Sequence, residues 1–231
     1  MFDLKQMFNQ YLEGQPENKA QAGLGGLGGI AGGALAGGLV GLLAGTKTGR
    51  KIGKNALTYG GTAVLGGLAY KAWRDWQSGK PVADAKSQGP EVVGALPQPP
   101  SDSAFVPEPG EEAAFDRVLI RAMLAGAKAD GEVDVQERRR IAEQMEATGM
   151  DEEMRDFVVA EMKRPLDMDE IVSGATCMET AAEIYTASLL VADPSGPAEQ
   201  GYLAMLAARL KLDPGLVEHI HANAARPVSV A

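Results

Sequence analysis

The chain has 231 residues and a formal net charge of −9, which is distributed unevenly along it. Residues 1–110 hold 10 Lys and Arg against 8 Asp and Glu, a net charge of +2, whereas residues 111–231 hold 12 against 23, a net charge of −11. An acidic domain of this kind is repelled by phosphate backbones, so a nucleic-acid partner is not expected. Divalent cations or basic protein surfaces suit it better. The single cysteine, Cys177, excludes an intrachain disulfide and is expected as a core thiol.

The first segment, residues 1–20, contains a short amphipathic helix. Its apolar side chains recur at helical spacing and form one face: Leu4, Met7, Phe8, Tyr11 and Leu12. Such a face can lie in a membrane interface or pack on a partner.

Residues 21–78 are predicted to be a glycine-rich membrane region. No residue from 20 to 46 is charged, and a helix over 22–45 would be about 36 Å long, enough to cross roughly 30 Å of hydrocarbon. In water so many glycines would destabilise a helix. In lipid the backbone N–H and C=O groups have no water to bond with, so the helix is kept. The other interpretation is a Gly/Ala-rich linker.

Within this region glycine occupies every fourth position, which places the glycines along one side of a helix and lets a second backbone approach closely. We therefore expect self-association through a glycine zipper. Its first members are Gly25, Gly29, Gly33, Gly37 and Gly41.

A basic segment, residues 47–54, follows the span, and a second apolar stretch, residues 56–70, follows that segment. The stretch ends in Tyr70, Trp73 and Trp76, interleaved with cations, which is typical of an interfacial belt. Two topologies fit, a single span or a hairpin. We favour the single span, which places the C-terminal domain in the cytoplasm with the basic segment. Residues 79–110 contain seven prolines and predict a disordered linker that lets the next domain stand away from the membrane.

Residues 111–225 show helical periodicity throughout and predict an all-α bundle of about seven helices. The starts of the later helices are indicated by Asp134, Asp151, Asp169, Cys177, Pro197 and Pro214. No segment has the pattern of a strand. Residues 127–137 and 190–199 are similar, because each has a helix ending in Ala-Asp, a tight turn and a helix with Glu in its first turn. This match predicts an internal duplication.

Four stretches in the bundle indicate a family: Ala-Asp-Gly-Glu-Val-Asp-Val-Gln-Glu (129–137), Glu-Ile-Tyr-Thr-Ala-Ser-Leu-Leu (183–190), Ala-Glu-Gln-Gly-Tyr-Leu (198–203) and Leu-Lys-Leu-Asp-Pro (210–214). They resemble the tellurite-resistance TerB-like domain. The whole chain resembles YebE-like inner-membrane proteins, a family of unknown function. The resemblance implies an α-helical bundle in a bacterial inner membrane protein, with clustered acidic residues that hold a divalent metal.

By position, Asp130 and Glu137 match the acidic motif, and Asp193 and Glu199 match its second copy, where Pro194 replaces the usual glycine. If the two units face each other, the four carboxylates could converge on Ca²⁺, Mg²⁺ or Mn²⁺. The other interpretation is helix capping, since Asp134 with Glu137 forms a capping box and Glu199 lies in the first turn of its helix.

No nucleophile constellation, phosphate-binding loop or zinc pattern is present in the sequence, so an enzyme is not expected and no cofactor beyond the divalent cation is implied. The sequence predicts a membrane-anchored interaction or sensing module with an unidentified protein partner. The resemblance links it to envelope or metal (tellurite-type) stress. The alternative is a glycine-zipper protein that forms oligomers or perturbs the bilayer, with the helical domain regulating it.

Overall fold

The computed structural model describes residues 61–83, 91–92, 96–131, 133, 135, 138–139, 141–142, 145, 151–192, 194–225 and 228–229. The chain divides into two compact units, residues 1–31 and 32–231, and all described residues belong to the second. The predicted amphipathic segment, the glycine row and the basic segment lie outside the described residues. Among the helices that are described, none combines the length and apolar character that crossing a membrane requires.

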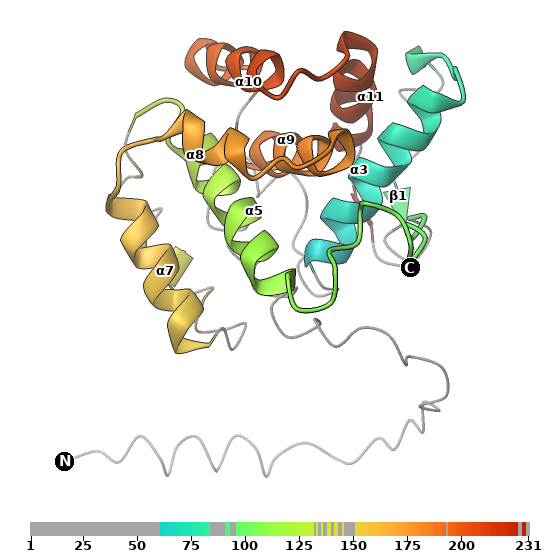
Figure 1. Cartoon of the computed structure of the whole chain (residues 1–231). Coiled ribbons are helices and arrows are strands. Elements are labelled where there is room, and N and C mark those ends of the chain that lie inside the picture. The colour runs from blue at the N-terminus through green and yellow to red at the C-terminus, as the bar shows by residue number, and fades with distance from the viewer. Residues whose placement is uncertain are drawn as a thin grey trace, which may run out of the picture. The chain divides into compact units, whose positions relative to one another are not determined.

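The predicted all-α bundle is confirmed for the described part of the chain (Figure 1). Helix α5 (Glu112–Ala127) is the predicted first helix, and α7 (Glu152–Lys163), α8 (Met168–Ser173), α9 (Met178–Val191), α10 (Pro197–Arg209) and α11 (Pro214–Ala224) follow at the expected places. The described residues between 135 and 145, where a second helix was predicted, are helical.

The helices begin at side chains that satisfy the free amides of the first turn. The Asp151 carboxylate accepts a hydrogen bond from the Met154 amide at 2.8 Å and starts α7, and Asp167 accepts one from the Glu170 amide at 3.1 Å and starts α8. At α11, Asp213 accepts from the Gly215 amide at 2.8 Å, and Pro214 occupies the first helical position. These caps explain why sequence signals located the helix starts closely.

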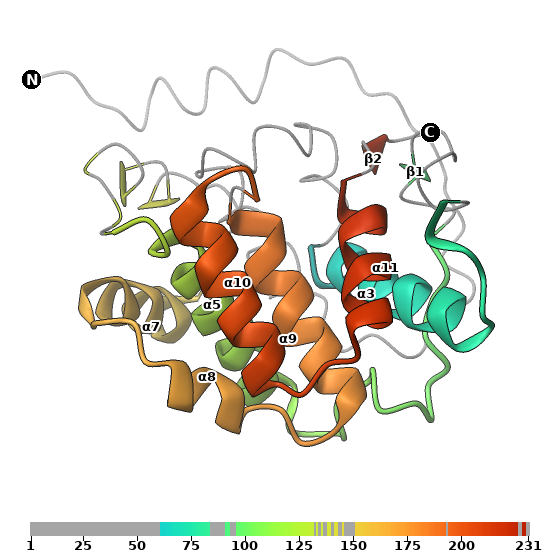
Figure 2. The same cartoon turned by 90° about the horizontal axis from the view of Figure 1, so that it is seen from above.

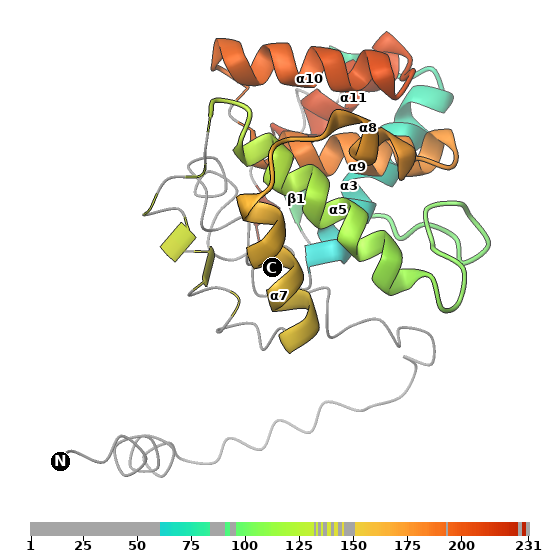
Figure 3. The same ribbon diagram turned by 60° about the vertical axis from the view of Figure 1, so that its left-hand side comes forward.

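The two helices that carry the predicted repeat pack against each other at the centre of the bundle. Figure 1 shows α9 crossing α5, and Figure 3 shows α7 alongside α5. At the crossing, a β-carbon on Gly126 would lie only 2.6 Å from the carbonyl oxygen of Ser188, so only glycine permits this approach. When Ala127 is aligned with Leu190, Ser188 is the counterpart of Ala125. The two copies therefore meet near equivalent positions, as a duplicated pair would.

Helix α3 (Gly61–Gln77) is part of this bundle, which corrects the sequence interpretation of its residues as membrane region. It packs on α11 and α9, as Figures 1 and 2 show, and its apolar face is buried: Leu65, Leu68, Ala69, Ala72 and Trp73. The paired glycines serve the same packing, since Gly66 faces Glu183 of α9 and Gly67 lies against Leu96. An apolar helix that ends in aromatic residues suits a lipid or a protein surface equally, and sequence alone does not separate the two.

A buried polar cluster joins α3 to α11. The Lys71 amine donates to Asn223 Oδ1 at 2.7 Å and to Asp75 Oδ2 at 3.1 Å, and Lys80 donates to Asp75 Oδ1 at 2.7 Å. Burial alone would raise the pKa of Asp75, but the hydrogen bonds from Lys80 and Lys71 outweigh it and hold this pKa below its usual range. Removing one partner from such a buried pair costs about 3–5 kcal/mol. The Lys71 cluster therefore fixes both the position and the rotation of α3.

The segment predicted to be a disordered linker contributes to the core. Leu96 and Phe105 are 4% and 5% exposed, and the Phe105 ring makes edge-to-face contacts with Tyr70 at 5.4 Å and Trp73 at 5.9 Å between ring centroids. Two of the three residues expected as an interfacial belt, Tyr70 and Trp73, thus pack against the proline-rich segment. Its few apolar residues have no period, so their burial could not be predicted from the sequence pattern.

Two strands of two residues each also depart from the all-helical expectation. Strand β1 (Glu91–Val92) pairs in parallel with β2 (Val228–Ser229), with Glu91 opposite Val228. Strands this short carry no alternating pattern, so a sequence analysis does not detect them.

The α5–α9 crossing predicts opposite effects of the same substitution at two glycines. Gly126→Ala should lower the free energy of unfolding by about 1–3 kcal/mol, because the helices must separate to admit a methyl group against backbone. Gly201→Ala, at an exposed position of α10 with no atom within 4 Å of the new β-carbon, should raise it by about 0.5–1 kcal/mol. Urea denaturation of the two variants measures both values. A neutral Gly126→Ala would contradict the close approach.

Candidate functional site

Two of the four predicted carboxylates lie in described residues, and Glu137 and Asp193 lie outside them. Asp130 is exposed in the turn after α5, and Glu199 is half-buried in the first turn of α10. Gly131, which follows Asp130, has a φ of +141°, a conformation that favours glycine. The backbone conformation therefore explains the glycine of the Asp-Gly pair without a bound ligand.

The position of Glu199 favours the capping interpretation. A β-carbon built on Gly196, the residue that caps α10, would lie 2.0 Å from Glu199 Oε2, so the carboxylate folds back over the start of its own helix. A carboxylate in this place is stabilised by the helix dipole by about 0.3–1 kcal/mol without a metal. Within the described part of the chain, no three His, Cys, Asp or Glu residues are grouped as a metal site would need. The four-carboxylate site stays a prediction.

A cleft of about 650 Å³ lies between the loop of residues 101–109, the start of α5 and the N-terminus of α9. Its apolar lining includes Val106, Phe115 and Val118. Three carboxylates line it as well, Asp102, Glu108 and Glu111, while no Lys, Arg or His is among its described lining residues. A mixed apolar and acidic lining suits a basic segment with apolar side chains better than an anion.

Cys177 is among the residues that line this cleft and caps α9, which corrects its interpretation as a core thiol. Its sulfur accepts a hydrogen bond from the Thr180 amide at 3.5 Å, and the Thr180 hydroxyl accepts one from the Cys177 amide at 3.1 Å. This is a capping box in which a half-exposed cysteine replaces the usual serine or threonine. Cysteine is uncommon as a cap, so the sequence predicted that this helix starts at Cys177 without predicting that the sulfur caps it.

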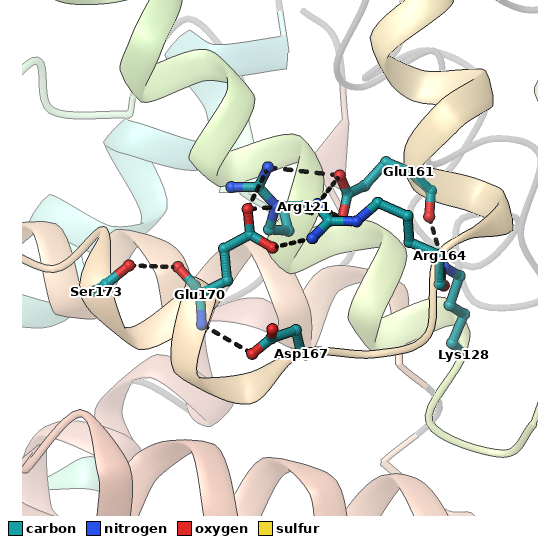
Figure 4. Close-up of polar contacts among 7 residues, drawn as sticks. All are labelled: Arg121, Lys128, Glu161, Arg164, Asp167, Glu170 and Ser173. Carbon is teal, nitrogen blue, oxygen red and sulfur yellow. Dashed lines mark hydrogen bonds and ion pairs between the residues drawn. The ribbon is translucent and has the colours of Figure 1, made fainter.

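An alternating cluster of two arginines and two glutamates joins α5, α7 and α8 (Figure 4). Arg121 pairs with Glu161 at 3.2 Å and with Glu170 at 3.0 Å, and Arg164 pairs with the same carboxylates at 3.1 and 2.7 Å. Lys128 donates to the carbonyl oxygens of Glu161 and Arg164, both at 2.7 Å. Opposite charges balance within the cluster, which indicates that it holds the helix ends together and is not poised to attract a charged ligand.

Buried hydroxyl groups make further contacts across the core. The Ser188 hydroxyl donates to the Ala122 carbonyl oxygen at 2.8 Å and lies 3.0 Å from the Tyr202 hydroxyl, and the Tyr185 hydroxyl lies 2.7 Å from His221 Nε2. Burial raises the pKa of Tyr185 to about 12 and lowers the pKa of His221, so both groups are neutral at physiological pH. Tyr185 is thus a core residue whose hydroxyl group has a hydrogen-bond partner.

Sequence analysis missed one chemically unusual residue, the buried Glu183 of α9. It was quoted only as part of a family motif, although an acidic residue between Ala182 and Ile184 in a largely apolar helix was an available signal. Glu183 is 3% exposed, and one of its carboxyl oxygens has no hydrogen-bond partner.

Comparison with known proteins gives a family and no activity. A family model described as "Protein of unknown function (DUF533)" matches residues 29–224, most of the chain. The chain belongs to the DUF533 family. A curated relative, the "Uncharacterized protein in ampR 5'region" of Yersinia enterocolitica, is 31% identical over 94 residues, which are 41% of this chain and 68% of the relative. No solved structure matches this DUF533 chain significantly.

The predicted metal site can be tested by calorimetric titration of the full chain with Ca²⁺, Mg²⁺ and Mn²⁺. Carboxylate sites bind such cations with dissociation constants of about 1 mM or lower, and Asp130→Ala should weaken the binding at least tenfold if Asp130 is a ligand. Asp102→Ala, which removes a carboxylate from the cleft instead, is the matched control. Binding weaker than millimolar, or equal binding by both variants, would leave capping as the role of these carboxylates.

Proposed function

We propose that this DUF533 protein is a membrane-tethered, non-enzymatic interaction or sensing module of the YebE-like inner-membrane type. The observation that carries the proposal is the packing of α3 into the acidic bundle. The uncharged glycine row over residues 22–45 and the basic segment 47–54 precede α3 by only a few residues. A tether in that row would therefore hold the bundle close to the lipid.

This arrangement changes the role of the proline-rich segment. As a linker between tether and domain it would let the bundle stand away from the membrane, but its residues Leu96 and Phe105 are buried and pack against α3. The only chain between the proposed tether and the folded unit is residues 46–60. A connection of this length favours a bundle that moves with its anchor.

The packing of α3 also favours a single membrane span over a hairpin. A second crossing would need residues 56–70, and from Gly61 onward these residues belong to a helix whose apolar face is covered by α9 and α11. With one span, the basic segment and the bundle lie on the same side. The positive-inside rule then places the bundle in the cytoplasm.

The acidic charge of the bundle supports an interaction with a basic protein surface. Residues 111–231 carry a net charge of −11, and the cleft beside Cys177 combines carboxylates with apolar side chains. Complementary charge speeds and orients such association. The glycine row would at the same time bring copies of the chain together in the bilayer, which gives the module a way to present several bundles at once.

The proposed tether predicts that the full-length chain sediments with membranes. After high-speed centrifugation without detergent it should remain in the pellet through high-salt and alkaline washes, because the span is held by hydrocarbon and not by charge. Leu35→Arg with Leu39→Arg should move the protein toward the supernatant, since each charge at the span centre costs about 2.5–3.5 kcal/mol. Gln77→Arg, on the exposed end of α3, is the control. A freely soluble full-length chain would refute the tether.

A further inference from the structure

The contact between α3 and α9 contains a carboxyl group that the packing does not satisfy. Glu183 projects from α9 toward Gly66 of α3, where a β-carbon would be 3.5 Å from Glu183 Oε1 and, among the described residues outside its own stretch of helix, would meet no other atom within 4 Å. Glu183 Oε2 is buried and has no hydrogen-bond partner. Helix α3, which covers this carboxyl, thus has only a glycine at the position that comes closest to it.

Near this contact, the lysine and the aspartate of α3 are already paired, whereas one histidine of α11 has an unpartnered ring nitrogen. On α3, Lys71 and Asp75 bind each other, and they are completed by Asn223 of α11 and by Lys80. On α11, His221 lies against Tyr185, while His219 is buried with an unpartnered Nδ1.

The arginines of α5, which also packs on α9, are paired with carboxylates of α7 and α8, Arg117 with Glu153 and Arg121 with Glu161 and Glu170. The buried carboxyl of α5 is Asp116, whose pKa is raised to about 6 by burial and by Glu112. The ionisable groups of α10 near the core are Tyr202, bonded to Ser188, and Glu199 at its own helix start. On α9 itself, Glu179 lies one turn before Glu183. None of these groups contributes to the shift of Glu183, because burial alone raises the pKa of its carboxyl well above the ordinary 4.5.

We propose that Glu183 is a proton-binding site that controls the docking of α3 on α9. With the proton bound, the carboxyl is neutral and α3 covers it without a large cost. Without the proton, a carboxylate that has no counter-charge among the described residues would have to stay out of water, so α3 loosens until water reaches it. This control belongs to the folded unit and does not depend on whether the chain is tethered to a membrane.

The direction of the effect follows from proton linkage. The docked state holds the proton of Glu183 up to a higher pH than the undocked state, in which the carboxyl titrates at its ordinary value. Docking is therefore fully favoured below pH 4.5, and it weakens as pH rises from there through the raised pKa of the docked state. Over that window one proton is released per undocking event, so the docking equilibrium constant falls about tenfold per pH unit.

The chain contains its own reporters for this motion. Both of its tryptophans, Trp73 and Trp76, lie on α3, where Trp73 is buried and Trp76 donates a hydrogen bond to Asp213 at 3.2 Å. A red shift of tryptophan emission therefore reports α3 leaving its place. Helix α7 packs on α5 and provides a reference for pH effects elsewhere in the bundle.

The test is amide hydrogen exchange of the full chain between pH 5 and 9, with protection corrected for intrinsic exchange and tryptophan emission followed in parallel. In the natural protein, protection over residues 61–77 should fall about tenfold per pH unit in the linkage window, while protection in α7 stays constant. In Glu183→Gln the protection of α3 should no longer change with pH. Glu179→Gln, which removes the same charge one turn earlier, should keep the full dependence. Protection of α3 that is independent of pH in the natural protein, or equally dependent in Glu183→Gln, would overturn the proposal.

A second pair of variants keeps the proposal testable if Glu183→Gln does not fold. Gly66→Ser places a hydroxyl within reach of Glu183 Oε1, where it can donate to the ionised carboxylate and lower its docked pKa. The pH dependence of α3 protection should then flatten at the upper end of the window. Gly66→Ala fills the same space without a donor and should keep the dependence of the natural protein. Identical profiles for the serine and alanine variants would count against Glu183 as the controlling group.

Discussion

The buried amine of Lys71 fixes the position of α3, and the packing of this helix on the bundle depends on this contact. Lys71 reaches Asn223 at the far end of the chain and Asp75 one turn along its own helix, and all three residues are removed from water. A cation in this place requires its partners, because an unpaired buried charge costs several kcal/mol. The apolar contacts of α3 drive it onto the bundle, and the Lys71 cluster selects one rotation and one register for it.

Two polar arrangements in the bundle have different consequences. The cluster of Arg121, Glu161, Arg164 and Glu170 is complete, since each charge has opposite partners, and it locks the ends of α5, α7 and α8. The carboxyl of Glu183 is incomplete, and it lies where α3 meets α9. The stability of the helix packing therefore differs between the α3–α9 contact and the cluster that joins α5, α7 and α8. The group whose charge state can alter the packing thus lies at the contact between α3 and α9.

The sequence predicted most helices correctly because their signals are local. Asp151, Asp213 and Pro197 mark helix starts through contacts within one turn, and apolar periodicity predicted the core face of α5. The location of α3 could not be predicted in this way, since its partners Asn223 and Asp213 are far away in the chain and its composition suits lipid as well as protein. Phe105 and Leu96 were missed for a related reason, because an isolated apolar residue among prolines has no period. Glu199 illustrates a third limit: a motif places a carboxylate in the first turn of a helix, but only coordinates show that it folds over Gly196.

The central claim, that α3 is an integral part of the acidic helical domain, can be tested by comparing two shortened chains, residues 56–231 and residues 79–231, by thermal unfolding with circular dichroism. The account predicts that the longer chain unfolds in one cooperative transition. The shorter chain should lose that transition or unfold at a much lower temperature, because removing α3 uncovers the apolar surfaces of α9 and α11 and leaves Asn223 without its partner. Equal melting temperatures and equal solubility for the two chains would contradict the account.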